Sequence, residues 1–101
     1  MSDIIEFRSE FSKPFDTQYK SIDEILNKPI LIKDIAIIEF QGRQIIHILA
    51  EDLEGNEFAF RTSSKVIIKQ LTQFEKHLKE GKKLKCKITK RKRYYTLAPP
   101  S

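Results

Sequence analysis

The chain has 101 residues, of which 40% are hydrophobic and 33% charged, and its formal net charge is +5. This length predicts one domain, and the composition is typical of a globular protein rather than a disordered one. No run approaches the roughly 20 apolar residues that a membrane span needs, and the acidic start is unlike a secretory signal. We therefore expect a cytoplasmic protein with no membrane partner.

Charge is distributed unevenly along the chain. Residues 1–60 hold 6 Lys or Arg and 12 Asp or Glu, a net of −6, whereas residues 61–101 hold 13 and 2, a net of +11. Such asymmetry indicates nucleic acid or another acidic partner. The single cysteine excludes a disulfide framework, and because Cys86 shares a strand face with Leu84 and Ile88, we expect a buried, unreactive thiol.

Residues 1–20 are predicted to form a partly ordered N-terminal arm. Phe7, Phe11 and Phe15 recur every four residues, but Pro14 would break a helix before the third ring. Three roles remain open for this arm: it docks an aromatic ring or two on the domain, it binds a protein partner, or its acidic residues shield a basic face.

The domain is predicted to span residues 21–98, with a tail at residues 99–101, and it begins with a short helical turn. Ser21 and Glu24 fit the capping-box pattern, in which each side chain bonds the other residue's backbone amide. The turn has one apolar side and ends before Pro29, so we expect a lid or plug rather than a long helix.

Three strands are predicted next. The isoleucine-rich run at residues 29–40 is the first. The alternation of its apolar side chains shifts by one residue near Lys33, which predicts a bulge. A turn at residues 41–43 leads to a second strand at residues 44–51. The dipeptide Gly-Asn then marks a second hairpin turn, and the third strand covers residues 57–62.

Side-chain parity in these strands decides which residues face a ligand. If Phe58 and Phe60 fill the core, Ala59 and Arg61 face outward; with inverted parity, Phe60 would be a stacking ring instead. His47 lies in a strand whose two faces are both mostly apolar. It is either a structural histidine or an outward group that stacks on a ligand or donates to it.

The hydrophobic period then changes to that of a helix over residues 65–79. Ser63 or Ser64 can cap its start, and Gly81 is placed to end it in the left-handed conformation. The predicted apolar stripe consists of Ile67, Leu71, Phe74 and Leu78.

Residues 81–98 predict a hairpin with a cationic tip. One strand face is apolar, and the opposite face carries Lys83, Lys85 and Lys87. Residues 76–93 hold ten Lys or Arg against one acid, Glu80. Because neighbouring like charges are destabilising without a counter-ion, this density indicates a bound polyanion.

The second strand of this hairpin carries two tyrosines. We expect Tyr95 and Leu97 to point inward, which turns Tyr94 and Thr96 outward. Tyr94 is then the leading candidate for a ring on which a base stacks.

The order of elements is three strands, a helix and two strands. It predicts a mainly β protein with the five-stranded Greek-key barrel of the OB-fold and one helix between the third and fourth strands. The stretches SIDEILNKPILIKDI, AEDLEGNEFAFRTSSKVIIKQL and KRKRYYTL also make the chain resemble a known family over about residues 21–98. This family is the short OB-fold single-stranded DNA-binding proteins of phages, plasmids and archaea, akin to single domains of replication protein A. The resemblance implies that Arg61 faces the ligand and that residues 90–94 form a ligand-contacting loop.

We therefore expect a sequence-tolerant single-stranded DNA-binding protein acting in DNA replication, recombination or repair. The candidate nucleic-acid-binding residues are Arg43, His47, Phe60, Arg61, Lys83, Lys85, Lys87, Lys90, Arg91, Lys92, Arg93 and Tyr94. Two alternatives stay open: an OB-fold protein that binds RNA, and a protein-interaction module that uses the N-terminal arm.

Catalytic and metal sites are not expected. The chain has no glycine-rich phosphate loop, and Ser63 and Ser64 have no histidine at a recognisable spacing. Two histidines and one cysteine are too few for a zinc site. We expect no enzyme activity, no cofactor and no metal.

Overall fold

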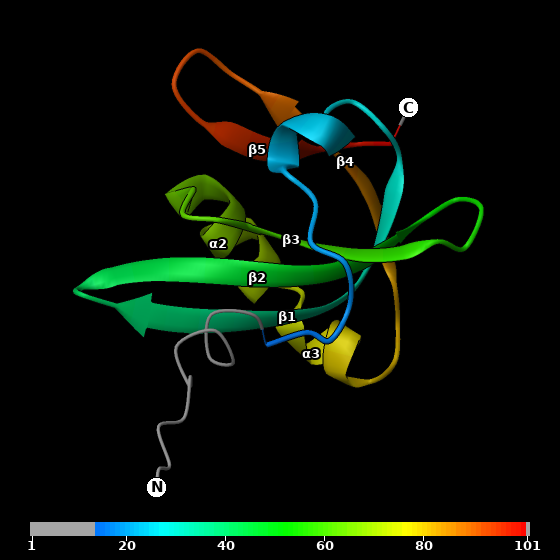
Figure 1. Cartoon of the computed structure of the whole chain (residues 1–101), viewed down its shortest axis with the longest axis horizontal. Helices are drawn as coiled ribbons and strands as arrows, with labels where there is room; N and C mark the ends of the chain where they lie inside the picture. The colour runs from blue at the N-terminus through cyan, green and yellow to red at the C-terminus, as the bar shows by residue number, and fades with distance from the viewer. Residues whose placement is uncertain (1–13, 101) are drawn as a thin grey trace, which may run out of the picture.

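The structure is a computed structural model that describes residues 14–100, and its architecture is mainly β (Figure 1). Five antiparallel strands form one sheet in the order β3-β2-β1-β4-β5. The strands are β1 (Ile30–Phe40), β2 (Arg43–Asp52), β3 (Glu57–Thr62), β4 (Leu84–Lys90) and β5 (Tyr95–Ala98). The helical segments are the 3₁₀ turn η1 (Ile22–Ile25), α2 (Lys65–Thr72) and α3 (Glu75–Lys79). Within residues 14–100, every helix is too short or too polar to span a bilayer.

The long strand β1 contains the predicted bulge. Its register with β2 shifts between Ile32 and Asp34, so one extra residue, Lys33, is inserted. A bulge increases the local twist of a strand, and the first residues of β1 pair with β4 as well as with β2. Because of the insertion, Ile32 and Ile35 are both buried on the same side, as the slip of parity predicts.

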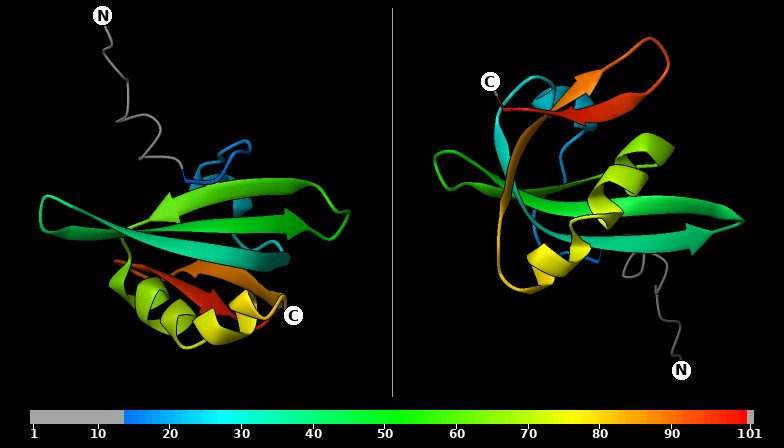
Figure 2. Two further views of the ribbon diagram at one scale, coloured as in Figure 1. Left: turned by 90° about the horizontal axis from the view of Figure 1, so that it is seen from below. Right: turned by 180° about the vertical axis from the view of Figure 1, so that it is seen from behind.

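The core lies between two layers. Figure 2 (left) shows β1, β2 and β3 as one layer, with α2, α3 and the β4–β5 hairpin on one side and the segment before η1 on the other. The largest fully buried side chains are Phe58, Phe60, Ile30, Ile32, Ile46, Ile48, Ile67, Leu71 and Ile88. The inward orientation of the two phenylalanines is thereby confirmed. Cys86 is also buried, and burial raises the pKa of its thiol to about 12, so the thiol stays protonated and unreactive.

The single helix predicted over residues 65–79 is wrong, because the chain forms two helices with a break before Glu75. The hydroxyl of Thr72 donates to the carbonyl oxygen of Ile68 at 2.7 Å, a contact that bends helices. Phe74 then leaves the helical conformation (φ −103°, ψ 1°), and its side chain is 36% exposed instead of completing the apolar stripe. Leu78, one turn later, still reaches the core.

The predicted caps are confirmed. Ser21 and Glu24 form the capping box of η1, and Ser64 caps α2 by accepting from the amide of Ile67. Gly81 follows α3 with φ +89°, a conformation that side chains with a Cβ rarely adopt.

Both outer edges of the sheet are covered. On β3, the amide of Ala59 donates to the carbonyl of Gln18 at 2.9 Å, and the amide of Lys20 donates back to Ala59 at 2.8 Å. On β5, the Ser64 hydroxyl donates to the carbonyl of Tyr95 at 2.8 Å, and the amide of Leu97 donates to the Gln70 side chain at 2.9 Å. Covering edges in this way blocks pairing with other chains.

Since both edges are occupied, no β3–β5 ladder closes the sheet within residues 14–100. The turn η1 makes contact across this opening. Its Ile25 is buried in the core, and its Asp23 accepts a hydrogen bond from the Tyr95 hydroxyl at 2.8 Å. The turn therefore acts as the predicted plug.

Candidate nucleic-acid interface

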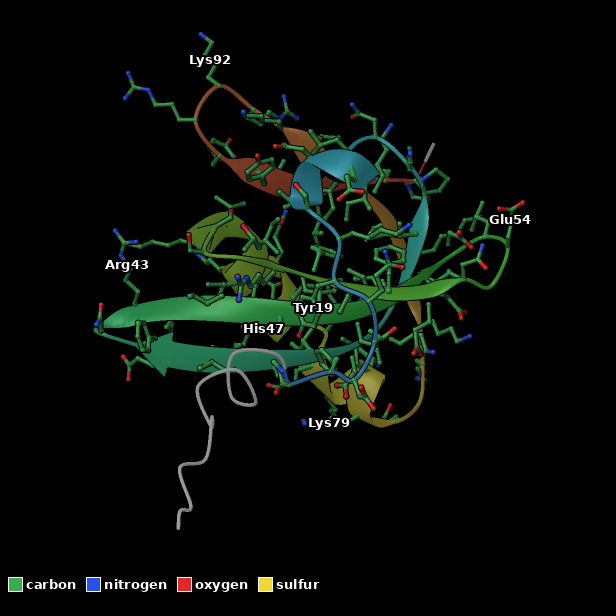
Figure 3. The ribbon with its side chains drawn as sticks, viewed as in Figure 1. Tyr19, Arg43, His47, Glu54, Lys79 and Lys92 are labelled. Carbon is green, nitrogen blue, oxygen red and sulfur yellow. The ribbon has the colours of Figure 1, made fainter. Side chains whose placement is uncertain are left out.

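Three connections of the chain lie on the same side of the molecule, at the left of Figure 1, with the loop that joins β4 to β5 standing well above the other two. They are the β1–β2 turn at residues 41–42, the β3–α2 connection at residues 63–64, and the β4–β5 loop at residues 91–94. We call the basic residues in and beside these connections the cationic end: Arg43, Lys65, Lys69, Lys90, Arg91, Lys92 and Arg93. Figure 3 shows Arg43 at the left and Lys92 at the top left, well apart from each other, and Glu54 at the right.

The cationic end has no counter-ions of its own in the described part of the chain. Among residues 14–100, no carboxylate oxygen lies within 4.0 Å of a side-chain nitrogen of these seven basic residues. Like charges held together without partners repel one another, so this region is set up to attract an anion.

The β4–β5 loop, which carries four of these cations, is held by contacts at its base. The amide of Arg91 donates to the carbonyl of Tyr94 at 2.7 Å, which closes the turn. The Lys90 ammonium lies 5.6 Å from the centre of the Tyr95 ring, a cation–π contact. Tyr94 is 46% exposed, beside the exposed side chains of residues 91–93. The predicted cationic tip and its outward tyrosine are thus both present.

The β1–β2 turn contributes a second ring that the sequence analysis did not select. Gln41 and Gly42 both have positive φ (53° and 78°), as a two-residue hairpin turn of type I′ requires. This turn sets Phe40 directly opposite Arg43, and Phe40 is 58% exposed. The signal was an aromatic residue at the last position of an apolar run, immediately before a turn.

A cavity of about 760 Å³ lies between the hairpin and α2. Its walls carry three cations, Arg43 from β2 and Lys65 and Lys69 from α2, against one acid, Glu39. The remaining lining residues are Gly42, Gln44, Ser63 and Ile68. Sequence reasoning missed Lys65 and Lys69 because they lie outside the dense basic run; their spacing of four residues, on one face of a helix, was the available signal.

His47 is on the outer face of the sheet but is not accessible, so its prediction as a ligand contact is corrected. It is 2% exposed because Tyr19 covers it, with the hydroxyl 3.1 Å from Nδ1 and the rings edge-to-face at 5.8 Å. Burial lowers the pKa of His47, and the charge of Arg61 lowers it further; burial likewise raises the pKa of Tyr19. Arg61, opposite His47 in the ladder, is exposed on the same outer face, as expected.

Phe60, which inverted parity would have made a stacking ring, and Thr96, which was predicted to face outward, are both buried. Phe60 is fully enclosed and stacks on Phe58 at 6.1 Å, so it offers no surface to a base. Thr96 is 8% exposed because α2 covers it, and its hydroxyl donates to Gln70 at 3.2 Å. Phe60 is therefore part of the core, whereas Thr96 is covered by a helix whose packing strand alternation does not predict.

The lysines of β4 and of the turn before it do not join the cationic end. Lys83 donates to Glu51 at 2.6 Å, which holds the pKa of that carboxyl below its usual value. Lys85 lines a smaller cavity of about 330 Å³, which shares no lining residue with the first, and Lys87 is half-buried in mid-strand. The predicted alternation is present, because Cys86 and Ile88 are buried whereas Lys85 is exposed and Lys87 half-buried. Lys83, however, is already paired with Glu51.

The opposite end of the molecule is acidic. We define this acidic end as Glu51, Asp52, Glu54 and Glu57, around the β2–β3 turn. Lys33 bonds Glu57 at 2.5 Å, and Asp52 accepts hydrogen bonds from the side chain and backbone of Asn56, which lower the pKa of its carboxyl. The carboxylates of Glu51, Asp52 and Glu57 are thus partnered locally.

The chain belongs to a protein family described as "Domain of unknown function (DUF8468)", whose model matches residues 16–98. The matched segment includes every described strand and helix. Neither the curated proteins nor the solved structures gave a match.

Proposed function

We propose that this protein binds single-stranded DNA with little sequence preference and acts in DNA replication, recombination or repair. The fold within this proposal is an OB-fold left open between β3 and β5. Its support is the strand order, the helices between β3 and β4, and a bulged β1 that pairs with both β2 and β4.

The observation that carries the proposal is the cationic end. Basic side chains from three separate connections of the chain lie on the same side of the molecule, and no acidic group of the described residues pairs with them. Two exposed rings, Phe40 and Tyr94, lie in the hairpin and loop that bear these cations.

The binding mechanism follows from this arrangement. Cations along the strand backbone replace condensed counter-ions, which supplies affinity without reading sequence. Bases are unpaired in a single strand, so their faces can rest on Phe40 and Tyr94, each stack contributing ~1 to 3 kcal/mol. A duplex hides those faces, so single strands are preferred.

The test is a titration of fluorescent oligo-dT at several salt concentrations. With about 4 to 6 phosphates neutralised, the logarithm of affinity should fall with the logarithm of salt at a slope of about −3 to −4. A slope near zero would remove the electrostatic interface. Oligo-rU of equal length serves as the comparison: tighter binding of rU would reassign the ligand as RNA.

A further inference from the structure

The cavity between the β1–β2 hairpin and α2 differs from the rest of the cationic end. The β4–β5 loop displays its cations on a protruding tip, whereas Arg43, Lys65 and Lys69 line a hollow of about 760 Å³. This volume is within the range of small-ligand sites, about 300 to 1,000 Å³. The protruding loop can contact the phosphates of a strand that runs past it, whereas the cavity can enclose a single chemical group.

The net charge of the cavity lining indicates which kind of ligand it can bind. Three cations and one carboxylate, Glu39, give the lining a net charge of +2. An internal phosphodiester carries a single negative charge, but a terminal phosphate monoester carries about −1.5 to −2 at neutral pH. The monoester therefore matches the lining charge better than the backbone of a continuous strand does.

The remaining lining suits the nucleoside attached to such a phosphate. Ile68 gives an apolar surface for a base or sugar. Glu39 and Gln44 are directly opposed across the β1–β2 ladder, so a carboxylate acceptor and an amide lie side by side. Such groups can bond the exposed edge of an unpaired base or a sugar hydroxyl.

From these features we infer that the cavity is a binding site for a nucleotide phosphate monoester, the phosphorylated end of a DNA strand. Arg43 on one wall and Lys65 and Lys69 on the other hold the phosphate between them. The inference rests on the proposed function, because the rest of the strand is held by the β4–β5 loop. It adds an end preference that the loop alone does not give.

The experiment compares short oligo-dT bearing a 5′-phosphate, a 3′-phosphate or hydroxyls at both ends. Wild-type protein should bind one phosphorylated form about tenfold more tightly than the hydroxyl form, equivalent to roughly 1.4 kcal/mol. The double variant Lys65→Gln with Lys69→Gln should lose this preference to within about twofold while still binding hydroxyl-ended oligo-dT measurably through the loop. The matched control, Lys76→Gln with Lys79→Gln on α3, removes the same charge outside the cavity and should keep the preference.

Equal binding of all three oligonucleotides by the wild type would overturn the inference and leave the proposed function standing. Retention of the preference in the Lys65/Lys69 variant would also overturn it. Absence of any oligo-dT binding would instead contradict the proposed function. Competition by dTMP identifies the source of the phosphate: displacement at concentrations comparable to the phosphorylated oligonucleotide assigns the site to free nucleotides, and failure to displace assigns it to strand ends.

Discussion

The acidic end and the cationic end differ in whether their charged side chains have partners within the protein. At the acidic end, Glu51 and Glu57 are bonded by Lys83 and Lys33, and Asp52 is bonded by its own turn. At the cationic end, no acid of the described residues lies within ion-pair distance. The number of charges is informative only together with their partners: Lys83 belongs to the basic run in sequence but to the acidic end in space.

The difference also extends to the aromatic rings. The acidic end has no exposed aromatic ring among residues 14–100, since its exposed large apolar side chain is Leu53. The cationic end presents Phe40 and Tyr94. Unpaired cations and exposed rings together suit a single strand, so the proposed binding site lies at one end alone.

The largest effect is expected from removing the loop cations. The triple variant Arg91→Gln, Lys92→Gln and Arg93→Gln should weaken oligo-dT binding by about 100-fold at moderate salt, since each lost phosphate contact removes a released counter-ion. Fluorescence titration measures the loss, and the salt slope should become shallower by about 2.

The matched control for this variant is Lys76→Gln, Lys79→Gln and Lys82→Gln, on α3 and the residues after it. It removes equal charge from a part of the surface outside both the loop and the larger cavity. Equal losses in the two triple variants would mean that net charge, not the cationic end, controls binding.

A smaller loss is expected from the exposed tyrosine of the loop. Tyr94→Ala should weaken oligo-dT binding by about 5- to 150-fold, the value of one base stack of ~1 to 3 kcal/mol, while Tyr94→Phe keeps the ring and should bind normally. Titration of both variants separates stacking from the hydroxyl group. If Tyr94→Phe is as weak as Tyr94→Ala, the ring does not stack.

Breaking the acidic end should leave binding almost unchanged. Lys83→Gln removes the hydrogen bond to Glu51 but no phosphate contact, so oligo-dT affinity should change by less than about twofold. The pKa of Glu51 should rise toward its ordinary value, which carboxyl NMR titration can follow. A loss like that of a loop cation would place Lys83 in the interface after all.

Mild acidification should weaken the packing of the segment before η1 on His47. It should leave the charges of the acidic end and the cationic end unchanged. Since the pKa of His47 is lowered below 6.5 in the folded protein, its stabilising contribution is present above pH 6.5 and is lost as pH falls through the folded value. The pKa values of Glu51 and Asp52 are also lowered, mainly by hydrogen bonds from Lys83 and Asn56, so these acids stay charged when mild acidification protonates a histidine.

Thermal melts between about pH 7.5 and about pH 5.5 measure this effect, because histidine is the side chain that ordinarily changes charge in that window. The melting temperature of the wild type should fall with pH, and His47→Gln should flatten the dependence while oligo-dT affinity stays within about twofold. An unchanged pH profile in the variant would mean that another group is responsible.

Local features of the sequence were predictable because each depends on few neighbouring residues. The bulge at Lys33, the capping box at Ser21, the cap at Ser64 and the left-handed Gly81 all follow from backbone chemistry that a short segment determines. Strand alternation places the two β3 phenylalanines on one face, and that face proves to be the inner one.

Contacts between distant segments were not predictable in this way. Alternation leaves the orientation of His47 open, and it cannot show that Tyr19, 28 residues earlier, lies on top of it. The same applies to Lys83 and Glu51, 32 residues apart. The predictions for His47 and Lys83 as ligand contacts therefore failed because their partners are distant in sequence and are brought close only by the tertiary fold.

The most direct test of a binding site confined to one end is to map oligo-dT on the protein by amide chemical shifts. The account predicts that the largest changes fall at residues 40–44, 63–69 and 90–94, with residues 51–57 unaffected. Changes centred on residues 51–57, or spread evenly over the whole sheet, would contradict it.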